Sequence, residues 1–379
     1  MIKICHIVNL ISGKADGVFA HLKMIFSNCD RSKYIHIIIF QGGDVIECEL
    51  QNLDIKYFVV KSLKKKIAFD TFISINKIIR EENPDILHTH LIKPYTIVGL
   101  LNIIHHKIMI FNYHGLFISN PYNSFFEKMI YSIIHNILFL LNTVDLAIVP
   151  SQNSKKLLLK ETKLFPSIKV YYNGYDFKKT VPLPDANVLS KIEEIKSKDK
   201  FILGFIGRIC LEKRFDIILQ ILSELLKKNL QVHLIVFGDG ESKFYYEILS
   251  EKLQIKNHIS FQGYVTGMEN YYKYLDAVLF ASDWEGMPLV LWESLANGIP
   301  VVAPDVGGFN EILQINNCGL VYQKSNEKEA VELLTDLIND KNKRIKLGKN
   351  GSKAVEDIYN ANNFISTIES IYGILLSNK

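Results

Sequence analysis

The stretch SDWEGMPLVLWESLANGIPVVAPDVGG, residues 282–308, contains the pattern from which the fold of this chain can be predicted. It begins where an apolar strand ends, and a loop with a glycine then leads to Pro288, which suits the first turn of a helix. Residues 289–297 predict a helix that stops at Gly298, and the β-branched run that follows predicts another strand. Strand, helix and strand in this order predict a parallel sheet covered by helices.

The same alternation of β-branched runs and amphipathic segments continues through the 379 residues. The predicted strands are KICHIVNL, YIHIIIF, KYFVV, DILHTH, KIMIFNYH and DLAIVP in the first half, and FILGFIG, QVHLIVFG, ISFQG, AVLFAS, GIPVVAP and GLVYQ in the second. A chain of this length commonly forms two domains. We therefore predict an α/β protein with two facing Rossmann-like, doubly wound domains and a cleft between them.

The domain boundaries follow from where this pattern lapses. Between the two series of strands, residues 181–200 hold two prolines and many lysines, which is typical of a linker. We expect an N-terminal domain at residues 1–180 and a C-terminal domain at residues 201–360. We also expect a final helix at residues 361–379 that packs back on the N-terminal domain.

Composition indicates a globular protein, with 48% hydrophobic and 22% charged residues. Five cysteines are scattered without a CxxC spacing, which indicates reduced thiols in a reducing compartment. The N-terminus shows no secretory signal pattern. The most apolar stretch, residues 125–142, contains Glu127 and Lys128, so we favour a half-buried helix over a membrane span. We therefore expect a cytoplasmic protein.

The charge is distributed unevenly along the chain. Residues 1–180 carry 22 Lys and Arg against 14 Asp and Glu, a net +8, whereas residues 181–379 carry 22 against 26, a net −4. Two groups of lysines contribute to the excess: Lys61, Lys64, Lys65 and Lys66, and Lys155, Lys156, Lys160 and Lys163. They fit peripheral contact with an anionic membrane face or acceptor, and an ordinary solvated lysine surface is the alternative. We expect no nucleic-acid partner.

The helix start within residues 282–308 predicts a binding site. Backbone amides in the first turn of a helix lack partners inside the helix, and the helix dipole favours negative charge there. The residues placed to bind a ligand are Gly286, Met287, Pro288, Leu289 and Val290. Two carboxylates flank this start, Glu285 in the loop and Glu293 inside the helix, and together they can hold two parts of one elongated ligand.

With EGMPLVLWE followed by ANGIPVVAPDVGG, the segment resembles the retaining, two-domain (GT-B) glycosyltransferases of the family 4 and group 1 type, which include bacterial capsule, exopolysaccharide and lipopolysaccharide enzymes. The resemblance implies that Glu285 contacts hydroxyls of the donor sugar as part of the catalytic centre, and that Glu293 binds the ribose. Asp283 and Glu285 also form a DxD-like triplet, and the alternative interpretation is that these two carboxylates bind a metal ion. Enzymes of this resemblance usually need no metal, so we expect neither a metal nor another cofactor.

The segment GFIGRICLEKRFD, residues 204–216, supplies cations after another strand. Negative charge develops on a diphosphate as the glycosidic bond breaks, and cations stabilise it. The resemblance implies that Arg208 and Lys213 bind the donor and take this catalytic role. We expect Arg214 to be a bystander on the following helix. In FQGYV, the resemblance places the backbone of Val265 beside the nucleobase.

The segment SGKADGVFAHL, residues 12–22, follows the first strand and resembles a glycine-rich loop that approaches the donor diphosphate. Gly17 matches the second glycine of the usual pair, and Asp16 stands where the first is expected. A carboxylate beside a diphosphate repels it, unless Lys14 compensates or Asp16 points toward the acceptor side.

Three histidines follow strands of the first half. The resemblance implies that His114, in NYHG, contacts the donor sugar within the catalytic centre, whereas a packed strand-end histidine is the alternative. His88 and His90, in HTH, point to one face of a strand and suggest a metal pair, but no third ligand is evident. We therefore assign His90 to the lining of the acceptor side.

These features predict a hexosyltransferase-type enzyme that moves a sugar with retention of configuration. The donor is a nucleoside diphosphate sugar, UDP favoured and GDP possible, and the acceptor a glycan or lipid-linked glycan in cell-surface polysaccharide biosynthesis. The alternatives are a sugar-nucleotide 2-epimerase on the same fold and a non-catalytic donor-binding subunit. An oxidoreductase is disfavoured because GxGxxG is absent after the first strand.

Overall fold

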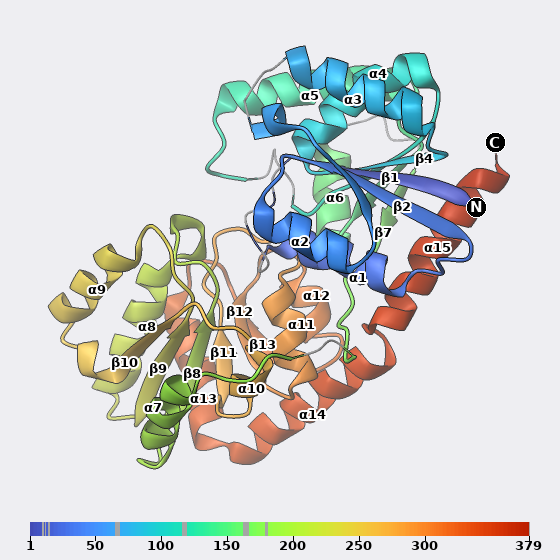
Figure 1. The fold of residues 1–379 in the computed structure, drawn as a ribbon. Helices are drawn as coiled ribbons and strands as arrows, with labels where there is room; N and C mark the ends of the chain where they lie inside the picture. The colour runs from blue at the N-terminus through green and yellow to red at the C-terminus, as the bar shows by residue number, and fades with distance from the viewer. Residues whose placement is uncertain are drawn as a thin grey trace. The chain divides into compact units, whose positions relative to one another are not determined.

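The computed structural model describes residues 1–9, 11, 13, 16–64, 69–115, 120–161, 167–178 and 181–378, and it divides into two compact units. Unit 1 comprises Met1–Asn173 and Ala361–Lys379, and unit 2 comprises Gly174–Asn360 (Figure 1). Lys14, a candidate to compensate the charge of Asp16, lies outside the described residues, as do Lys65, Lys66 and Lys163 of the two basic groups.

Unit 1 is built around a seven-stranded parallel sheet in the order β3-β2-β1-β4-β5-β6-β7. Its strands are β1 (Ile2–Val8), β2 (Tyr34–Phe40), β3 (Lys56–Val59), β4 (Ile86–His90), β5 (Ile108–Asn112), β6 (Leu146–Val149) and β7 (Ile168–Val170). The chain moves outward from β1 to β3 and then returns to place β4 on the other side of β1. This reversal creates a topological switch point at the carboxyl ends of β1 and β4, where ligands bind in such sheets.

Helices cover both faces of the unit 1 sheet (Figure 1). One face packs on α1 (Gly17–Asn28), α2 (Asp44–Asn52) and α15 (Ala361–Ser377), which bury Phe19, Ile46 and Phe364. The other packs on α3 (Phe69–Glu82), α4 (Ile92–His105), α5 (Phe125–Leu140) and α6 (Gln152–Glu161). A short 3₁₀ helix, η1 (Lys61–Lys64), precedes α3. Because both faces are covered, the central strands are buried on both sides.

Unit 2 contains a six-stranded parallel sheet in the order β10-β9-β8-β11-β12-β13. Its strands are β8 (Phe201–Ile206), β9 (Val232–Phe237), β10 (Ile259–Gly263), β11 (Ala277–Leu279), β12 (Val301–Pro304) and β13 (Gly319–Tyr322). Its helices are α7 (Ala186–Lys196), η2 (Leu211–Lys213), α8 (Phe215–Lys227), α9 (Lys243–Lys252), η3 (Lys256–His258), α10 (Glu269–Tyr272), α11 (Leu289–Ala296), α12 (Phe309–Leu313), α13 (Glu327–Asn339) and α14 (Lys341–Asp357). The switch point lies between β8 and β11.

The predicted class, two Rossmann-like parallel-sheet domains, is confirmed by these two sheets. Two details differ from the expectation. The stretch interpreted as a linker contains α7, whose Ile192 and Ile195 are buried in unit 2. Pro288 is the residue before the first turn of α11 and has an extended backbone, with φ −69° and ψ 142°, because the helix begins only at Leu289.

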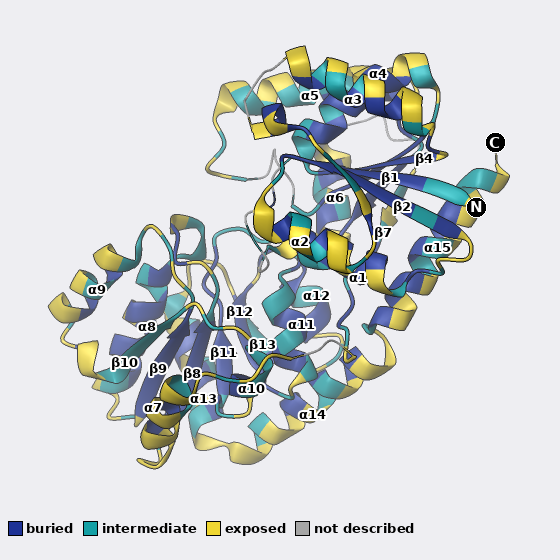
Figure 2. Ribbon diagram, viewed as in Figure 1, coloured by how far each residue is buried: buried dark blue, intermediate teal, exposed yellow. Residues whose placement is uncertain are grey.

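Helix α5 has an apolar face that its neighbours leave uncovered (Figure 2). It begins with a capping box in which Ser124 and Glu127 bond each other's backbone amides. His135, Leu138 and Phe139 face the core, whereas large apolar side chains on the other side are exposed: Phe125, Phe126, Met129, Ile130, Ile133, Ile137 and Leu140. Across the described ranges, no helix has the length and apolarity needed to span a membrane.

Candidate functional site

The carboxyl ends of β8 and β11 in unit 2 bring together two loops that carry predicted site residues. The loop after β8 ends in η2, which carries Lys213, and the loop after β11 carries Glu285 and leads into α11. The amide of Asp283 donates to the carbonyl oxygen of Glu212 at 2.9 Å, which joins the two loops directly. Lys213 and Glu285, which are 72 positions apart in the sequence, are therefore held side by side.

Glu285 and Lys213 form an ion pair in which Lys213 Nζ contacts Glu285 Oε1. Ser282 Oγ donates to the same carboxylate oxygen at 2.7 Å. The Glu285 side chain is only 9% exposed and that of Lys213 is 26% exposed. A paired, largely desolvated carboxylate and ammonium are strongly oriented. The arrangement offers a hydrogen-bond acceptor for hydroxyl groups beside a cation for phosphate.

Arg214 is not a bystander on a helix. It precedes α8 with a left-handed backbone, φ 48°, and its guanidinium donates to Asp216 and to both carboxylate oxygens of Asp283, the latter at 3.2 Å each. Lys324 Nζ also lies 3.5 Å from Asp283 Oδ1. The Asp283 carboxylate is thus engaged by two cations, which disfavours the alternative reading of Asp283 and Glu285 as a metal clamp. Arg214 instead fastens the two loops together.

Glu293 lies on α11 and accepts a hydrogen bond from the hydroxyl of Tyr272 at 3.1 Å. Tyr272 is fully buried, and burial, followed by the charge of Glu293, raises its pKa well above the usual value, so it remains a donor. The sequence analysis missed Tyr272, because a tyrosine at the end of the short helix α10 has no motif around it. Its hydroxyl fixes one oxygen of Glu293.

The other predicted donor-binding residues of unit 2 lie in the loops after β8, β10 and β11. Gly286, Met287, Pro288, Leu289 and Val290 form the turn that enters α11, with Gly286 and Met287 buried and the other three half-buried. Arg208 is exposed in the loop after β8, and Val265 is half-buried in the loop after β10.

Gly307 supports this turn from the following loop. Its φ is +57°, and an added Cβ would lie 2.6 Å from the carbonyl oxygen of Glu285 and 2.7 Å from that of Gly286. The amide of Gly308 donates to the Gly286 carbonyl at 3.1 Å. The position of the Glu285 backbone therefore depends on a glycine at residue 307.

In unit 1, Asp16 is the N-cap of α1. Its carboxylate accepts from the amides of Val18 at 2.9 Å and Phe19 at 3.2 Å. This explains why an aspartate stands where a glycine was expected, because aspartate is among the best N-cap residues. Gly17 is the first residue of α1, and the space beside its Cα is open. Lys14 lies outside the described residues.

His114 follows β5 and is half-buried, and its Nε2 contacts His90 Nδ1 at 3.0 Å and Asn112 Nδ2 at 3.2 Å. His90, which we expected to line the acceptor side, is instead fully buried, and its Nε2 contacts His6 Nδ1 at 3.1 Å. Both ring nitrogens of His90 thus face other histidines. The reason is that β4 lies inside the sheet, where its alternate residues point into the face covered by α1 and α15.

This face gathers six histidines: His6, His21, His36, His88, His90 and His114. Burial, with smaller contributions from the neighbouring histidines, lowers the pKa of His6, His88, His90 and His114 well below its ordinary value. The pKa of His21 falls to about 4 for the same reason, despite its hydrogen bond to Asn173. All these rings are therefore neutral at physiological pH.

The sequence showed no third histidine beside His88 and His90 that could complete a metal site, whereas the structure places His6 next to them. His6, His88 and His90 offer nitrogens within 4.8 Å of one another, and so do His21, His90 and His114. The period-two spacing in KICHIVNL, YIHIIIF and HTH could have indicated that these histidines share one face.

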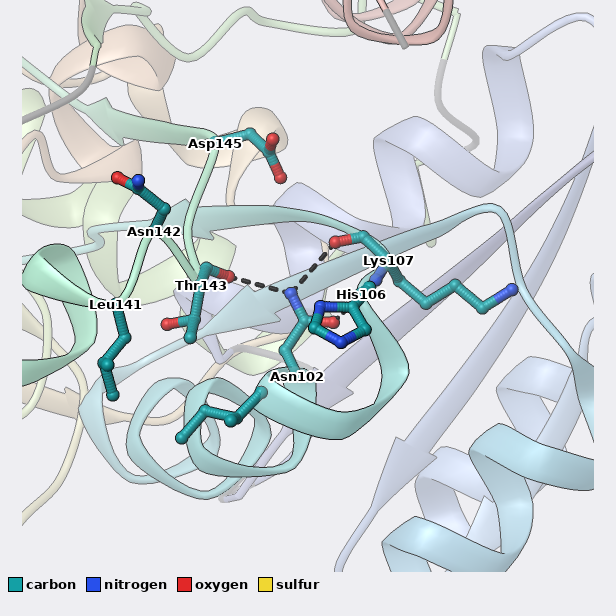
Figure 3. A pocket seen from close by; sticks show the side chains of 8 residues that line it. Asn102, His106, Lys107, Leu141, Asn142, Thr143 and Asp145 are labelled. Atoms are coloured by element: carbon teal, nitrogen blue, oxygen red, sulfur yellow. Dashed lines mark hydrogen bonds between the residues drawn. The ribbon is translucent and has the colours of Figure 1, made fainter.

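A pocket of about 250 Å³ lies elsewhere in unit 1, beside the last turn of α4 (Figure 3). Asn102 closes its floor by donating to the carbonyl oxygens of Lys107 at 2.9 Å and Thr143 at 2.8 Å. Lys107 and Asp145 directly precede β5 and β6 in the chain. The pocket is therefore at the amino-terminal edge of the sheet, opposite the edge where parallel sheets bind ligands.

Comparison with known proteins supports an assignment for both units. A family model described as "Glycosyl transferases group 1" matches residues 189–354, and one described as "Glycosyltransferase Family 4" matches residues 17–179. The UDP-Gal:alpha-D-GlcNAc-diphosphoundecaprenol alpha-1,3-galactosyltransferase of Escherichia coli is 24% identical, over 86% of this chain and 85% of that protein. The capsular polysaccharide biosynthesis glycosyltransferase CapM of Staphylococcus aureus is 25% identical, over 90% of each chain.

Other curated relatives align over little more than half of their own length, 54% and 58% in two cases. Among solved structures, HepE of Anabaena in complex with UDP has a TM-score of 0.80 at 19% identity, with 98% of this chain and 100% of that chain covered. At this level of identity, the structural likeness shows a shared two-domain GT-B fold.

Proposed function

We propose that the chain is a glycosyltransferase, because family models for Family 4 and group 1 glycosyltransferases match its first and second halves. In this proposal it transfers a sugar from a UDP-sugar, with retention of configuration, to a glycan or lipid-linked acceptor in cell-surface polysaccharide assembly. The observation that carries this proposal is the Glu285–Lys213 pair at the entrance to α11. In this proposal Glu285 is the carboxylate that binds the sugar, and Lys213 is the neighbouring cation that binds the phosphate.

In the proposed reaction, the bond between the anomeric carbon and the β-phosphate oxygen breaks while the acceptor oxygen bonds to the same face of that carbon. Arg208, Lys213 and the amides at the start of α11 stabilise the charge that develops on the departing UDP. The departing phosphate takes the proton of the acceptor hydroxyl. Glu285 orients the sugar, and Glu293 binds the ribose. For His114, the resemblance implies a hydrogen bond to the sugar.

The choice of UDP rests on two similar proteins: the E. coli relative is named for UDP-Gal, and the Anabaena structure contains UDP. The lipid-linked acceptor rests on the name of the same E. coli relative, and the polysaccharide context rests on the name of CapM. A thermal-shift screen of the full chain against UDP, GDP and ADP sugars tests the base, and product analysis with an undecaprenyl diphosphate-linked glycan tests the acceptor.

Two substitutions test the site. We expect Glu285→Gln and Lys213→Ala each to lower kcat by about 10² to 10³, the usual loss when one oriented charge-stabilising group is removed. Lys256→Ala is the matched control, because Lys256 pairs with Glu251 on the exposed surface of the same unit. Wild-type transfer rates for both site variants, with folding intact, would refute the assignment.

The same assay separates the competing enzyme class. A sugar-nucleotide 2-epimerase consumes the UDP-sugar without an acceptor and leaves a changed sugar on the nucleotide, whereas a transferase releases UDP only when the acceptor is present. A non-catalytic subunit binds UDP-sugar and does neither. Chromatography of the nucleotide products, with and without acceptor, distinguishes the three outcomes.

We further propose that unit 1 contacts an anionic membrane surface, the location of lipid-linked acceptors. Two observations support this proposal. The outer face of α5 exposes Phe125 at 77% and Phe126 at 70%, and Lys61 and Lys64 are exposed in η1, ahead of α3. Exposed apolar residues bury into the boundary of a bilayer, and lysines add attraction to anionic lipids.

Co-sedimentation with phosphatidylglycerol vesicles tests this contact. The double variant Phe126→Ser, Ile130→Ser should weaken binding at least about tenfold, because two apolar side chains leave the interface. Phe244→Ser is the control, since Phe244 is 74% exposed on α9 in unit 2. Equal vesicle binding by the wild-type chain, the double variant and Phe244→Ser would contradict the proposal.

A further inference from the structure

The buried histidines of unit 1 form a hydrogen-bonded chain that ends at His114. His36 Nδ1 contacts His6 Nε2 at 3.0 Å, His6 Nδ1 contacts His90 Nε2 at 3.1 Å, and His90 Nδ1 contacts His114 Nε2 at 3.0 Å. Every link joins the Nδ1 of one ring to the Nε2 of the next. A neutral imidazole has one N–H donor and one acceptor nitrogen, so the whole chain must share one direction.

Asn112 and His36 determine that direction. The Asn112 amide nitrogen donates to His114 Nε2 and to His21 Nε2, both at 3.2 Å, so His114 Nε2 is an acceptor. His90 must then donate from Nδ1, and the same holds for His6 and His36. The far end of the chain agrees, because His36 Nε2 is buried with no hydrogen-bond partner among the described residues. The opposite direction would leave an N–H there, and orphaned buried N–H groups are rarer than orphaned acceptors.

We propose that His90 is a positioning residue which, with Asn112, holds His114 as the Nδ1–H tautomer, so that His114 presents a neutral hydrogen-bond donor to an oxygen of the donor sugar. His114 Nδ1 makes no hydrogen bond with any described residue and belongs to a half-buried side chain. The identity of the ligand rests on the proposed function, whereas the tautomer does not. His114 therefore serves as a fixed donor and not as a general base.

A bound divalent metal is the other use for such a cluster, and the histidine groups offer suitable spacing. Both groups consist of histidines alone, and five of the six rings are at most 6% exposed. A doubly charged ion among neutral rings in this core would carry an uncompensated charge, which is costly in a medium of low polarity. The hydrogen-bonded chain needs no such compensation.

The tautomer can be measured directly. In protein labelled with ¹⁵N-histidine, long-range proton–nitrogen spectra at pH 7.5 distinguish protonated from unprotonated ring nitrogens, and His114→Gln identifies the signals of His114. We expect a protonated Nδ1 and an unprotonated Nε2. An Nε2–H tautomer, an imidazolium, or one equivalent of metal in the protein as purified would overturn the inference.

A matched pair of variants tests the positioning role. Asn at residue 90 carries an amide N–H close to where His90 Nδ1 lies, and Asp is the same size but can only accept. We expect His90→Asp to have a kcat/KM with UDP-glucose or UDP-galactose at least about tenfold below that of His90→Asn, and to switch His114 to Nε2–H or to the charged form. Both variants should bind UDP alone with the same Kd.

The outcomes separate the two proposals. If the two variants show the same transfer rate and the same His114 spectrum, His90 does not position His114 and the inference fails. If UDP-sugars do not bind the wild-type chain at all, the proposed function fails, while the spectrum of His114 still decides the tautomer. Should His90→Asp not fold, the wild-type spectrum alone decides the tautomer.

Discussion

Replacing Gly307 by alanine should reduce transfer as well as stability, because the new Cβ displaces the backbone of Glu285. The left-handed backbone costs a residue with a Cβ roughly 1–2 kcal/mol. The new Cβ would also lie 2.6 Å from the carbonyl oxygen of Glu285, and an ordinary contact begins at 3.4 Å, so that carbonyl must move by about 0.8 Å. Misplacement of a catalytic group by about 1 Å can cost 10²-fold in rate. We therefore expect kcat/KM to fall about 10- to 100-fold, or ~1.4–2.7 kcal/mol.

Gly298→Ala provides the matched control for this experiment. Gly298 also has a left-handed backbone, φ +71°, but an added Cβ would meet its nearest neighbour, the carbonyl oxygen of Gly348, at an unstrained 3.8 Å. Both variants should lose the roughly 1–2 kcal/mol of a left-handed backbone in urea unfolding, and Gly307→Ala should lose more because of its close contact. Only Gly307→Ala should lose transfer with a UDP-sugar. Equal transfer rates for the two variants would show that contact with the Glu285 carbonyl does not position the site.

Two further predictions concern groups around the candidate site. Tyr272→Phe removes the hydrogen bond to Glu293, and hydrogen bonds to charged groups contribute about 1.5–3 kcal/mol. We therefore expect titration calorimetry to show that UDP binds the variant roughly tenfold more weakly. An unchanged Kd would show that Glu293 does not bind the nucleotide. Burial lowers the pKa of His21 and His36 to about 4, so between pH 6.5 and 4 the unfolded chain binds more protons than the folded chain. The free energy of unfolding should therefore decrease as pH falls through this window, by ~1.4 kcal/mol per pH unit for each histidine. A urea midpoint equal at pH 7 and pH 5 would contradict that sign.

The fold class was predictable because both sheets consist of short apolar runs with clear helical segments between them. All six predicted strands of the second half are present, whereas the first half has a seventh, β7. That strand has three residues, none fully buried, so it lacks the apolar run that identifies its neighbours. The helix α7 was missed for a related reason: two prolines precede it, and it buries only Ile192 and Ile195.

The candidate site was predictable where a local motif carries it. Glu285, Glu293 and Lys213 lie in segments whose strand, loop and helix order is visible in the sequence. Their non-local partners were not, because Tyr272 meets Glu293, and Lys213 meets Glu285, only when the chain folds. The bond between Arg214 and Asp283, which joins the two loops, is likewise a tertiary contact. The same limit applies to His90, whose burial depends on which strands become neighbours.

The position of α15 affects how this protein is synthesised. Its Tyr372 hydroxyl bonds His88 Nδ1 at 2.9 Å, and Phe364 packs on Tyr171, so the core of unit 1 includes residues that follow unit 2 in the sequence. A ribosome must first produce all of Gly174–Asn360, which takes roughly 10–40 s at bacterial to eukaryotic rates of elongation. During that time the nascent first unit lacks α15, one of the three helices that cover one face of its sheet, which makes it a candidate client for chaperones that bind emerging chains.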